Sequence, residues 1–280
     1  MTCKPVEERA LHQHIRRRTV RLLDFTDKSA GGSAVTVKLR NRYFLATAAH
    51  VIPNGHEIRI LVGEGHDENI SSFLARHVDE NDDVGLLELD ESTAGKINRD
   101  FTAAEQLLLQ LDQSSGWCAT LIGYPSQSVV TEQNKVGSIL HRTHSFATLT
   151  IVTELIPRKE WPRKASFERR PPLSRSDLFV KVDPNTVVYQ QDLTDLDPAD
   201  SPSNVTEVQL AGMSGCGIWL DRVLDDEIWR PEPILAGIDT GALPKQGWAR
   251  GTQISRWLKL VIKHYKDLKE IGEQLKRNSK

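Results

Sequence analysis

Cysteine is scarce in this 280-residue chain, which contains only Cys3, Cys118 and Cys216. A secreted protein of modest size would usually carry several paired cysteines, so we expect reduced thiols, as in the cytoplasm. The N-terminal segment lacks the apolar stretch of a secretory signal. No run of about 18 apolar residues is present that could form a membrane helix. These absences favour a cytoplasmic protein that has no membrane partner.

An excess of charge of one sign is also absent, because 36 lysines and arginines stand against 38 aspartates and glutamates. Proteins that bind nucleic acid commonly carry a basic excess, so we expect no nucleic acid as the main partner. Histidine pairs such as His12 with His14 lack the cysteines or carboxylates that would complete a metal site. We therefore expect neither a metal nor another cofactor.

Short β-rich segments separated by turn residues make up most of the chain. One set lies between residues 19 and 90, and a second lies between residues 117 and 241. Strands spaced in this way, without helices alternating between them, are typical of antiparallel sheets and barrels. From Ile254 to Leu275, apolar residues instead recur every three or four positions, which predicts a helix with one apolar face.

The sequence thus predicts an all-β fold of two antiparallel β-barrels with a C-terminal α-helix. The expected parts are a partly helical segment at 1–18, a first barrel at 19–115, a second barrel at 116–251 and the helix at 252–280. A proline-broken segment at 157–175 is rich in arginine and lysine, and we expect it to be an exposed basic loop. This basic loop and the C-terminal helix are the two surfaces that could bind a partner protein.

Three motifs contain the residue types that nucleophilic catalysis by a serine requires: a histidine base, an aspartate that orients it, and the serine itself. His50 follows the apolar segment LATAA, where an imidazole can leave the core and act as a general base. Asp83 directly precedes the apolar run VGLLEL, so its carboxylate can be partly buried and can hold a histidine. Ser214 lies in the glycine-rich turn GMSGCG, whose backbone N–H groups can converge on an oxyanion. Each motif alone is common, but their joint order is specific.

Together, TAAHV, DVGLLEL and GMSGCG resemble the histidine, aspartate and serine motifs of the trypsin-like (chymotrypsin-fold) serine peptidases. The resemblance runs from about residue 19 through the C-terminal helix and is closest to small bacterial intracellular members. It implies a serine endopeptidase that acts through an acyl-enzyme, with His50, Asp83 and Ser214 as the catalytic triad. The backbone N–H groups of Gly212 and Ser214 would form the oxyanion hole. Asp82 is the alternative acid, but the family pattern places the acid directly before Val-Gly.

The chain departs from the secreted members of that family beside the expected site. Val51 stands where they usually have a disulfide cysteine, which agrees with a reducing compartment. Met213 stands where their zymogens keep an aspartate that pairs with a newly cut N-terminus, so we expect no activation by N-terminal cleavage. Cys216 replaces a usual glycine, and we expect it to pack rather than to react.

The residues expected to bind substrate lie before and after the serine. Val208 occupies the position, six before the serine, at which trypsin has the acidic residue that selects arginine or lysine. In this family, Asp239, Thr240 and Gly241 should form one wall of the specificity pocket. Asp239 could pair there with an arginine or lysine before the scissile bond. It could equally be a buried structural aspartate that is bonded to nearby backbone.

Other functions compete with proteolysis of a protein or peptide substrate. Ser214, Asp239 and His264 follow the order of an α/β-hydrolase triad, but Cys216 breaks the G-x-S-x-G motif and no βαβ rhythm is present. A catalytically silent binding module on the same double barrel would use the cleft or the basic loop. Nucleic-acid binding through the basic loop ranks lower, because few aromatic residues are interleaved with the basic ones.

Overall fold

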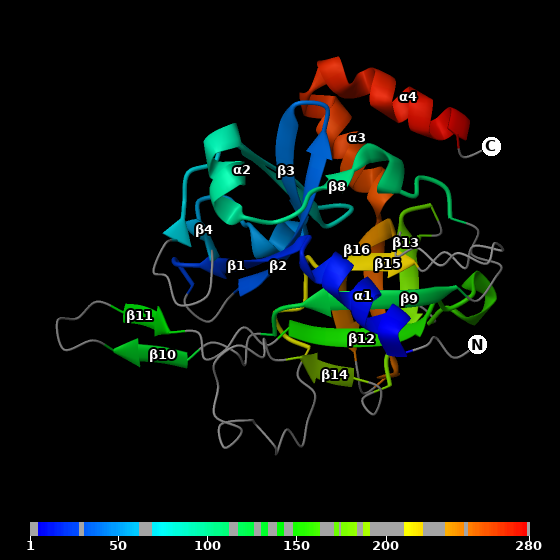
Figure 1. The fold of residues 1–280 in the computed structure, drawn as a ribbon. Helices are drawn as coiled ribbons and strands as arrows, with labels where there is room; N and C mark the ends of the chain where they lie inside the picture. Colours follow the sequence, from blue (N-terminus) through cyan, green and yellow to red (C-terminus); the bar gives the residue numbers. More distant parts are fainter. Residues whose placement is uncertain are drawn as a thin grey trace.

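The computed structural model describes residues 5–27, 31–61, 69–111, 117–125, 130–133, 139–142, 148–162, 171–173, 175–183, 187–190, 210–220, 233–243 and 246–278. Within these ranges the chain forms two large, mainly antiparallel β-sheets, with helices near both ends (Figure 1). The predicted arrangement of two barrels followed by a C-terminal helix is confirmed. No helix in this part of the chain is long and apolar enough to span a bilayer.

The first sheet contains the strands that flank His50 and Asp83. Its strands are β1 (Thr19–Asp24), β2 (Gly31–Leu39), β3 (Arg42–Thr47), β4 (Ile58–Leu61), β5 (Asn69–Ile70), β6 (Ala75–Asp79), β7 (Val84–Leu89) and β8 (Thr102–Ala103). They pair in the order β5-β4-β1-β2-β3-β7-β6, and β8 lies parallel to β2. A helix that we did not predict, α2 (Glu91–Ile97), follows β7 and begins after Asp90, whose carboxylate accepts the N–H of Thr93.

The second sheet contains the strand that follows Ser214. Its strands are β9 (Cys118–Gly123), β12 (Thr148–Glu154), β13 (Asp177–Lys181), β14 (Val187–Gln190), β15 (Gly217–Leu220), β16 (Ile234–Leu243) and β17 (Trp248–Gln253). They pair in the order β13-β17-β16-β15-β9-β12-β14. A separate hairpin joins β10 (Val130–Gln133) to β11 (Ile139–Arg142). Before the first sheet, α1 (Pro5–Arg16) lies over the second sheet near β9 (Figure 1).

Strand β7 is apolar on both faces because both faces are covered. Val84 and Leu86 belong to the core that β2 and β3 share with the C-terminal helix. Leu87 and Leu89 instead belong to a core formed by the first sheet and α2. The strand therefore lacks the polar alternation of a half-exposed strand. Its rigid setting fixes the turn before it, in which Asp83 lies.

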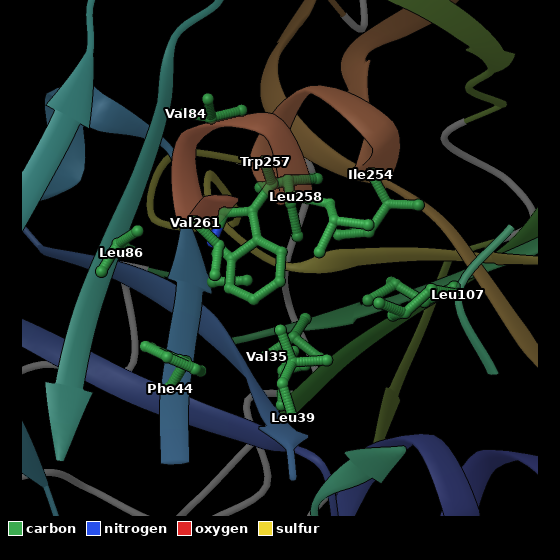
Figure 2. Packing of buried hydrophobic residues seen from close by; sticks show 14 of the residues in the cluster. Val35, Leu39, Phe44, Val84, Leu86, Leu107, Ile254, Trp257, Leu258 and Val261 are labelled. Atoms are coloured by element: carbon green, nitrogen blue, oxygen red, sulfur yellow. The ribbon is translucent and has the colours of Figure 1, made fainter. Parts of the chain in front are cut away.

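The C-terminal helix α3 (Ile254–His264) closes the core between the sheets (Figure 2). Trp257 is fully buried, and its ring meets the Phe44 ring edge to face at a centroid distance of 6.1 Å. Truncating a buried aromatic side chain of this size costs about 3–5 kcal/mol in typical cores. We therefore regard α3 as an integral part of the double barrel.

The predicted single helix at 252–280 is divided in the structure. A 3-10 turn (Lys266–Leu268) follows α3, and α4 (Lys269–Asn278) comes after it. The break falls at Tyr265, which leaves helical geometry at φ −122° and ψ 86°. Its hydroxyl donates to Glu88 Oε2 at 2.9 Å, and its ring is buried. This tertiary contact interrupts the helix, and the spacing of apolar residues carries no sign of it.

The basic loop is only partly described. Residues 158–160 form a short 3-10 turn, and the indole of Trp161 donates to the backbone oxygen of Ile156 at 3.0 Å. Positions 163–170 and 174 of this segment lie outside the described residues, as does Val208. The docking role that we predict for this loop stays a prediction.

Candidate active site

His50 lies in a single 3-10 turn, Ala49–Val51, which directly follows β3. Its neighbours Ala49 and Val51 are buried, whereas the imidazole is about 30% exposed. Burial of the flanking residues fixes the backbone of the turn and leaves the ring at the surface. This is the placement that a general base needs, because it must be rigid and still reach a substrate.

Asp83 ends the turn between β6 and β7. The carboxylate of Asp79 accepts the N–H groups of Asn81 at 3.0 Å and Asp82 at 3.3 Å, which closes the turn. Asp83 then adopts a left-handed backbone with φ 51°, a conformation that aspartate tolerates better than most residues. Its side chain is 15% exposed and lies at the start of buried β7.

His50 and Asp83 are joined by three contacts. The His50 Nδ1 atom lies 3.0 Å from Asp83 Oδ1 and 2.9 Å from Oδ2, and the His50 backbone N–H donates to Oδ1 at 3.2 Å. An ionised carboxylate only accepts hydrogen bonds, so Nδ1 must carry a proton. The neutral ring then has its lone pair on Nε2. The pair is therefore oriented so that Nε2 can accept a proton from another group.

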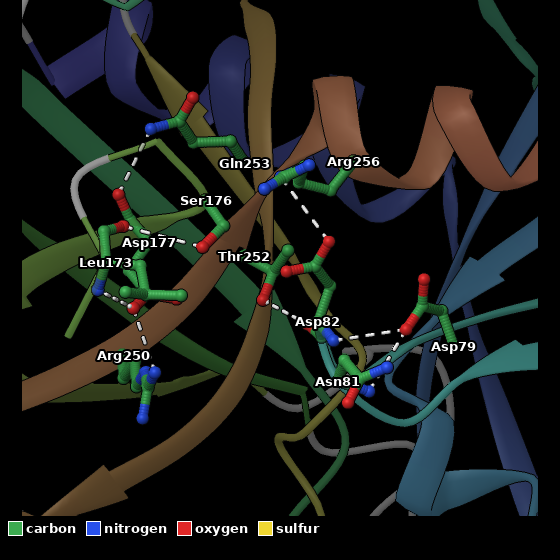
Figure 3. A network of polar contacts seen from close by, with 10 residues as sticks. All are labelled: Asp79, Asn81, Asp82, Leu173, Ser176, Asp177, Arg250, Thr252, Gln253 and Arg256. Atoms are coloured by element: carbon green, nitrogen blue, oxygen red, sulfur yellow. Dashed lines mark hydrogen bonds and ion pairs between the residues drawn. The ribbon is translucent and has the colours of Figure 1, made fainter. Parts of the chain in front are cut away.

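Asp82, the alternative acid, faces the second barrel and the C-terminal helix (Figure 3). Its Oδ2 lies 3.4 Å from Nε of Arg256 in α3. Its backbone oxygen accepts the hydroxyl of Thr252, in β17, at 2.6 Å. These contacts fix the acid turn of the first barrel to the second barrel. The structure thus pairs His50 with Asp83 and gives Asp82 an anchoring position.

The serine turn between Leu210 and β15 requires glycine at two positions. Gly212 and Gly215 have φ values of 89° and 90°, a region that side chains disfavour. A Cβ atom on Gly215 would lie 2.0 Å from the Ser33 backbone oxygen and 2.2 Å from Thr47 Oγ1. The glycine therefore permits the turn to approach the end of β3, three residues before His50.

The backbone of Ser214 packs against the histidine segment. Its carbonyl oxygen accepts the N–H of Ser33, in β2, at 2.8 Å. A Cβ atom on Gly32 would lie 2.6 Å from Val51 Cγ1 and 2.8 Å from the Ser214 oxygen. Ser214 and Val51, the residue after His50, therefore both pack against Gly32. The serine turn and the histidine turn, which are distant along the chain, thus pack against the same strand, β2.

The proposed oxyanion donors are the backbone N–H groups of Gly212 and Ser214. In the part of the chain that the structure describes, neither group donates to another protein atom. The neighbouring turn bonds are made by Met213, which donates to Leu210, and by Cys216, which donates to Met213. The hydrogen bonds that close the turn are therefore made by other N–H groups.

Asp239 lies beneath the serine turn and is only 2% exposed. Its backbone N–H donates to the oxygen of Cys216, and its oxygen accepts the N–H of Gly215, both at 2.8 Å. Burial raises the pKa of the Asp239 carboxyl to about 7; the N–H of Gly241 opposes this shift, and the charge of Asp83 adds to it. Burial, with a smaller contribution from Asp239, also raises the pKa of the Cys216 thiol, which makes a thiolate nucleophile unfavourable.

The other expected substrate contacts surround a bulge in β16. The pairing of β16 with β17 shifts between Asp239 and Gly241. Thr240 is half-buried, and its hydroxyl donates to the Arg250 oxygen at 3.2 Å. Gly241 is also half-buried. The burial of Asp239, next to these more accessible residues, favours a structural aspartate over a carboxylate that lines a pocket.

Comparison with solved structures decides the fold. The Rv3671c protease from M. tuberculosis, in its active form, superposes with a TM-score of 0.51 at 11% identity, over 93% of this chain and 87% of that one. This chain has the chymotrypsin-like double-barrel fold. The inactive form of the same protein, a mutant, matches at a TM-score of 0.47 and 10% identity, over 94% of both chains.

A serine endoprotease from Yersinia pestis also matches at a TM-score of 0.47, with 12% identity over 95% of this chain and 68% of that chain. No protein-family model matches the sequence, and no curated protein matches it. At such identities a structural likeness shows the fold and leaves the chemistry to be argued from the residues.

Several residues that build this site escaped the sequence analysis. Thr252 and Arg256 fix the acid turn, and Ser33 holds the serine turn. Ser33 follows two glycines, which signal a turn, but nothing near it in the sequence indicates a contact with Gly212, 179 residues away. Such contacts depend on the packing of one barrel on the other, which local patterns do not encode.

Proposed function

We propose that this protein is a serine endopeptidase with His50, Asp83 and Ser214 as its triad. The observation that carries the proposal is the His50–Asp83 pair, in which Nδ1 contacts both carboxylate oxygens while the serine turn packs on the same segment. The chymotrypsin-like fold supports it, because serine peptidases share that fold. The activity itself is our inference from this geometry.

The proposed reaction begins when Ser214 Oγ attacks the carbonyl carbon of a peptide bond and His50 Nε2 takes the hydroxyl proton. Asp83 stabilises the imidazolium that forms. The N–H groups of Gly212 and Ser214 bind the oxygen of the tetrahedral intermediate. His50 then gives its proton to the leaving amine, and the C–N bond breaks to leave an acyl-enzyme. Water, activated by His50, hydrolyses the ester and restores the serine.

We infer that the substrates are proteins or peptides and that the enzyme is a selective processing protease of the cytoplasm. A preference for arginine or lysine before the scissile bond depends on Asp239, whose carboxyl group is buried and accepts the N–H of Gly241. If Asp239 nevertheless selects a basic side chain, Asp239→Asn must change the preference that a peptide library reports. We expect the preference to stay the same.

The experiment that tests the proposed function identifies the new protein N-termini made by the wild-type chain and by Ser214→Ala. Both proteins are added to the same cell extract, and the peptides after cleavage are quantified. We expect a set of ends that forms only with the wild type, because the variant lacks the nucleophile. Identical sets of ends would contradict a serine peptidase and would favour the catalytically silent binding module.

A further inference from the structure

Ser33 lies at the start of β2 and makes two hydrogen bonds with the serine turn. Its backbone N–H donates to the oxygen of Ser214 at 2.8 Å. Its hydroxyl lies 3.2 Å from the oxygen of Gly212 and donates to it. Gly212 and Ser214 are the two residues whose N–H groups the proposed mechanism directs at the oxyanion. Ser33 therefore holds both of these residues by their carbonyl groups.

The direction of the Ser33 hydroxyl proton is set by a second partner. The backbone N–H of Tyr124 donates to Ser33 Oγ at 2.9 Å, so the oxygen acts as acceptor there. The hydroxyl hydrogen is then left for the Gly212 oxygen. The oxygen lies beside Gly123, where an added Cβ atom would be 2.9 Å from it, so the absence of a side chain there leaves room for the hydroxyl. The two hydrogen-bond partners hold the hydroxyl in one orientation.

The serine turn needs such an external support because its own backbone is permissive. Gly212 and Gly215 flank the nucleophile, both at positive φ, and glycine has many accessible backbone conformations. A rotation at Gly212 would turn its neighbouring peptide groups away from the oxyanion. A hydrogen bond to the Gly212 oxygen from a rigid strand opposes that rotation.

Ser33 is in turn tied to the histidine segment. The hydroxyl of Thr47, the last residue of β3, donates to the Ser33 oxygen at 2.7 Å. Thr47 lies three residues before His50, so two hydrogen bonds lead from the end of β3 to the oxyanion turn. The support is therefore anchored to the same strand end that positions the general base.

We propose that Ser33 is a positioning residue whose hydroxyl holds Gly212 so that the oxyanion donors stay preorganised. The proposal rests on the serine endopeptidase function inferred above. Ser33 does not touch the reacting atoms, and it acts through the carbonyl group of Gly212. Preorganised donors act mainly on the transition state, so loss of the hydroxyl should affect kcat more than KM.

The test compares Ser33→Ala with the wild type, because this change removes the hydroxyl and keeps the backbone N–H. We expect kcat to fall about 10- to 100-fold, below the ~10²–10³ typical for the loss of an oxyanion donor itself, with KM changed less than about 3-fold. Binding of a peptide trifluoromethyl ketone, whose adduct places an oxyanion in the hole, should weaken in parallel with kcat/KM. The pH profile of kcat/KM should keep its midpoint, because the contact between His50 and Asp83 is intact.

Thr36→Val is the matched control. Thr36 is a buried residue on the same strand, and its hydroxyl lies 2.5 Å from the oxygen of Asp100 and 3.1 Å from that of Arg18, away from the serine turn. Its loss should reduce the free energy of unfolding by a similar amount and leave kcat unchanged. If Ser33→Ala proves too unstable to assay, Ser33→Cys keeps the side-chain volume, replaces the hydroxyl by a weak hydrogen-bond donor, and gives the second measurement.

Three outcomes are distinguishable. A selective loss of kcat and inhibitor affinity in the Ser33 variant supports the positioning role. An active wild type whose Ser33 and Thr36 variants behave alike overturns this inference and leaves the proposed function intact. A wild type that hydrolyses no peptide overturns the proposed function, and the positioning role with it.

Discussion

Asp83→Asn lowers kcat by about 10⁴-fold, as expected for an acid that fixes the tautomer of a catalytic histidine. The amide can place an N–H where His50 Nδ1 now finds only acceptor oxygens at 2.9 and 3.0 Å. That arrangement favours the tautomer whose proton is on Nε2, which cannot accept the proton of Ser214. The measurement is steady-state hydrolysis of a peptide that the wild type cleaves.

Asp82→Asn is the control for this prediction because it changes the adjacent carboxylate in the same turn. It weakens the ion pair with Arg256 but keeps the backbone bond to Thr252. We expect kcat to fall less than about 10-fold, since an exchange of this kind typically costs about 1 kcal/mol or less. If kcat falls further in Asp82→Asn than in Asp83→Asn, Asp82 is the catalytic acid and our assignment of Asp83 is wrong.

Asp239→Asn makes the protein more stable at pH 8 by up to about 4 kcal/mol and leaves its stability near pH 4 almost unchanged. The folded state holds the Asp239 proton until about pH 7, whereas the ordinary value is 3.8. Between these values the unfolded chain binds fewer protons than the folded one. The free energy of unfolding of the wild type therefore falls as the pH rises through this window.

The amide in Asp239→Asn has no proton to lose there, and its oxygen can still accept the N–H of Gly241. Urea unfolding of both proteins near pH 4 and at pH 8 measures the effect. The difference between variant and wild type isolates Asp239, since every other titrating group is common to both. A difference that is equal at the two pH values would show that the Asp239 carboxyl is not neutralised by burial.

The parts of the fold that the sequence predicts correctly are those set by local patterns. Strand β7 shows why, because its sequence VGLLEL places apolar residues on both faces, and both faces are covered by the two cores around it. The three motifs also fall on a strand end, a turn and a glycine-rich turn, where backbone geometry exposes a side chain. The choice of Asp83 over Asp82 depended only on its place before Val84, and the structure pairs that residue with His50.

The features that were missed depend on contacts between distant segments. The three- and four-residue spacing of apolar residues near the C-terminus predicts one helix. The buried Tyr265 and its hydrogen bond to Glu88 divide this helix in two. Strand β17 escaped notice because WARGTQ has little apolar character, although it pairs with both β13 and β16. Helix α2 did carry a signal in its N-cap, Asp90, which the apolar run of β7 directly before it obscured.

Labelling with a fluorophosphonate probe tests the central claim most directly, because the probe bonds only to a serine that an adjacent base activates. The wild type, Ser214→Ala and His50→Ala are labelled at neutral pH after their folding has been checked by circular dichroism. We predict that the wild type is labelled at Ser214 and that both variants are not. A folded wild type that stays unlabelled, or a label that persists in Ser214→Ala, would contradict the account.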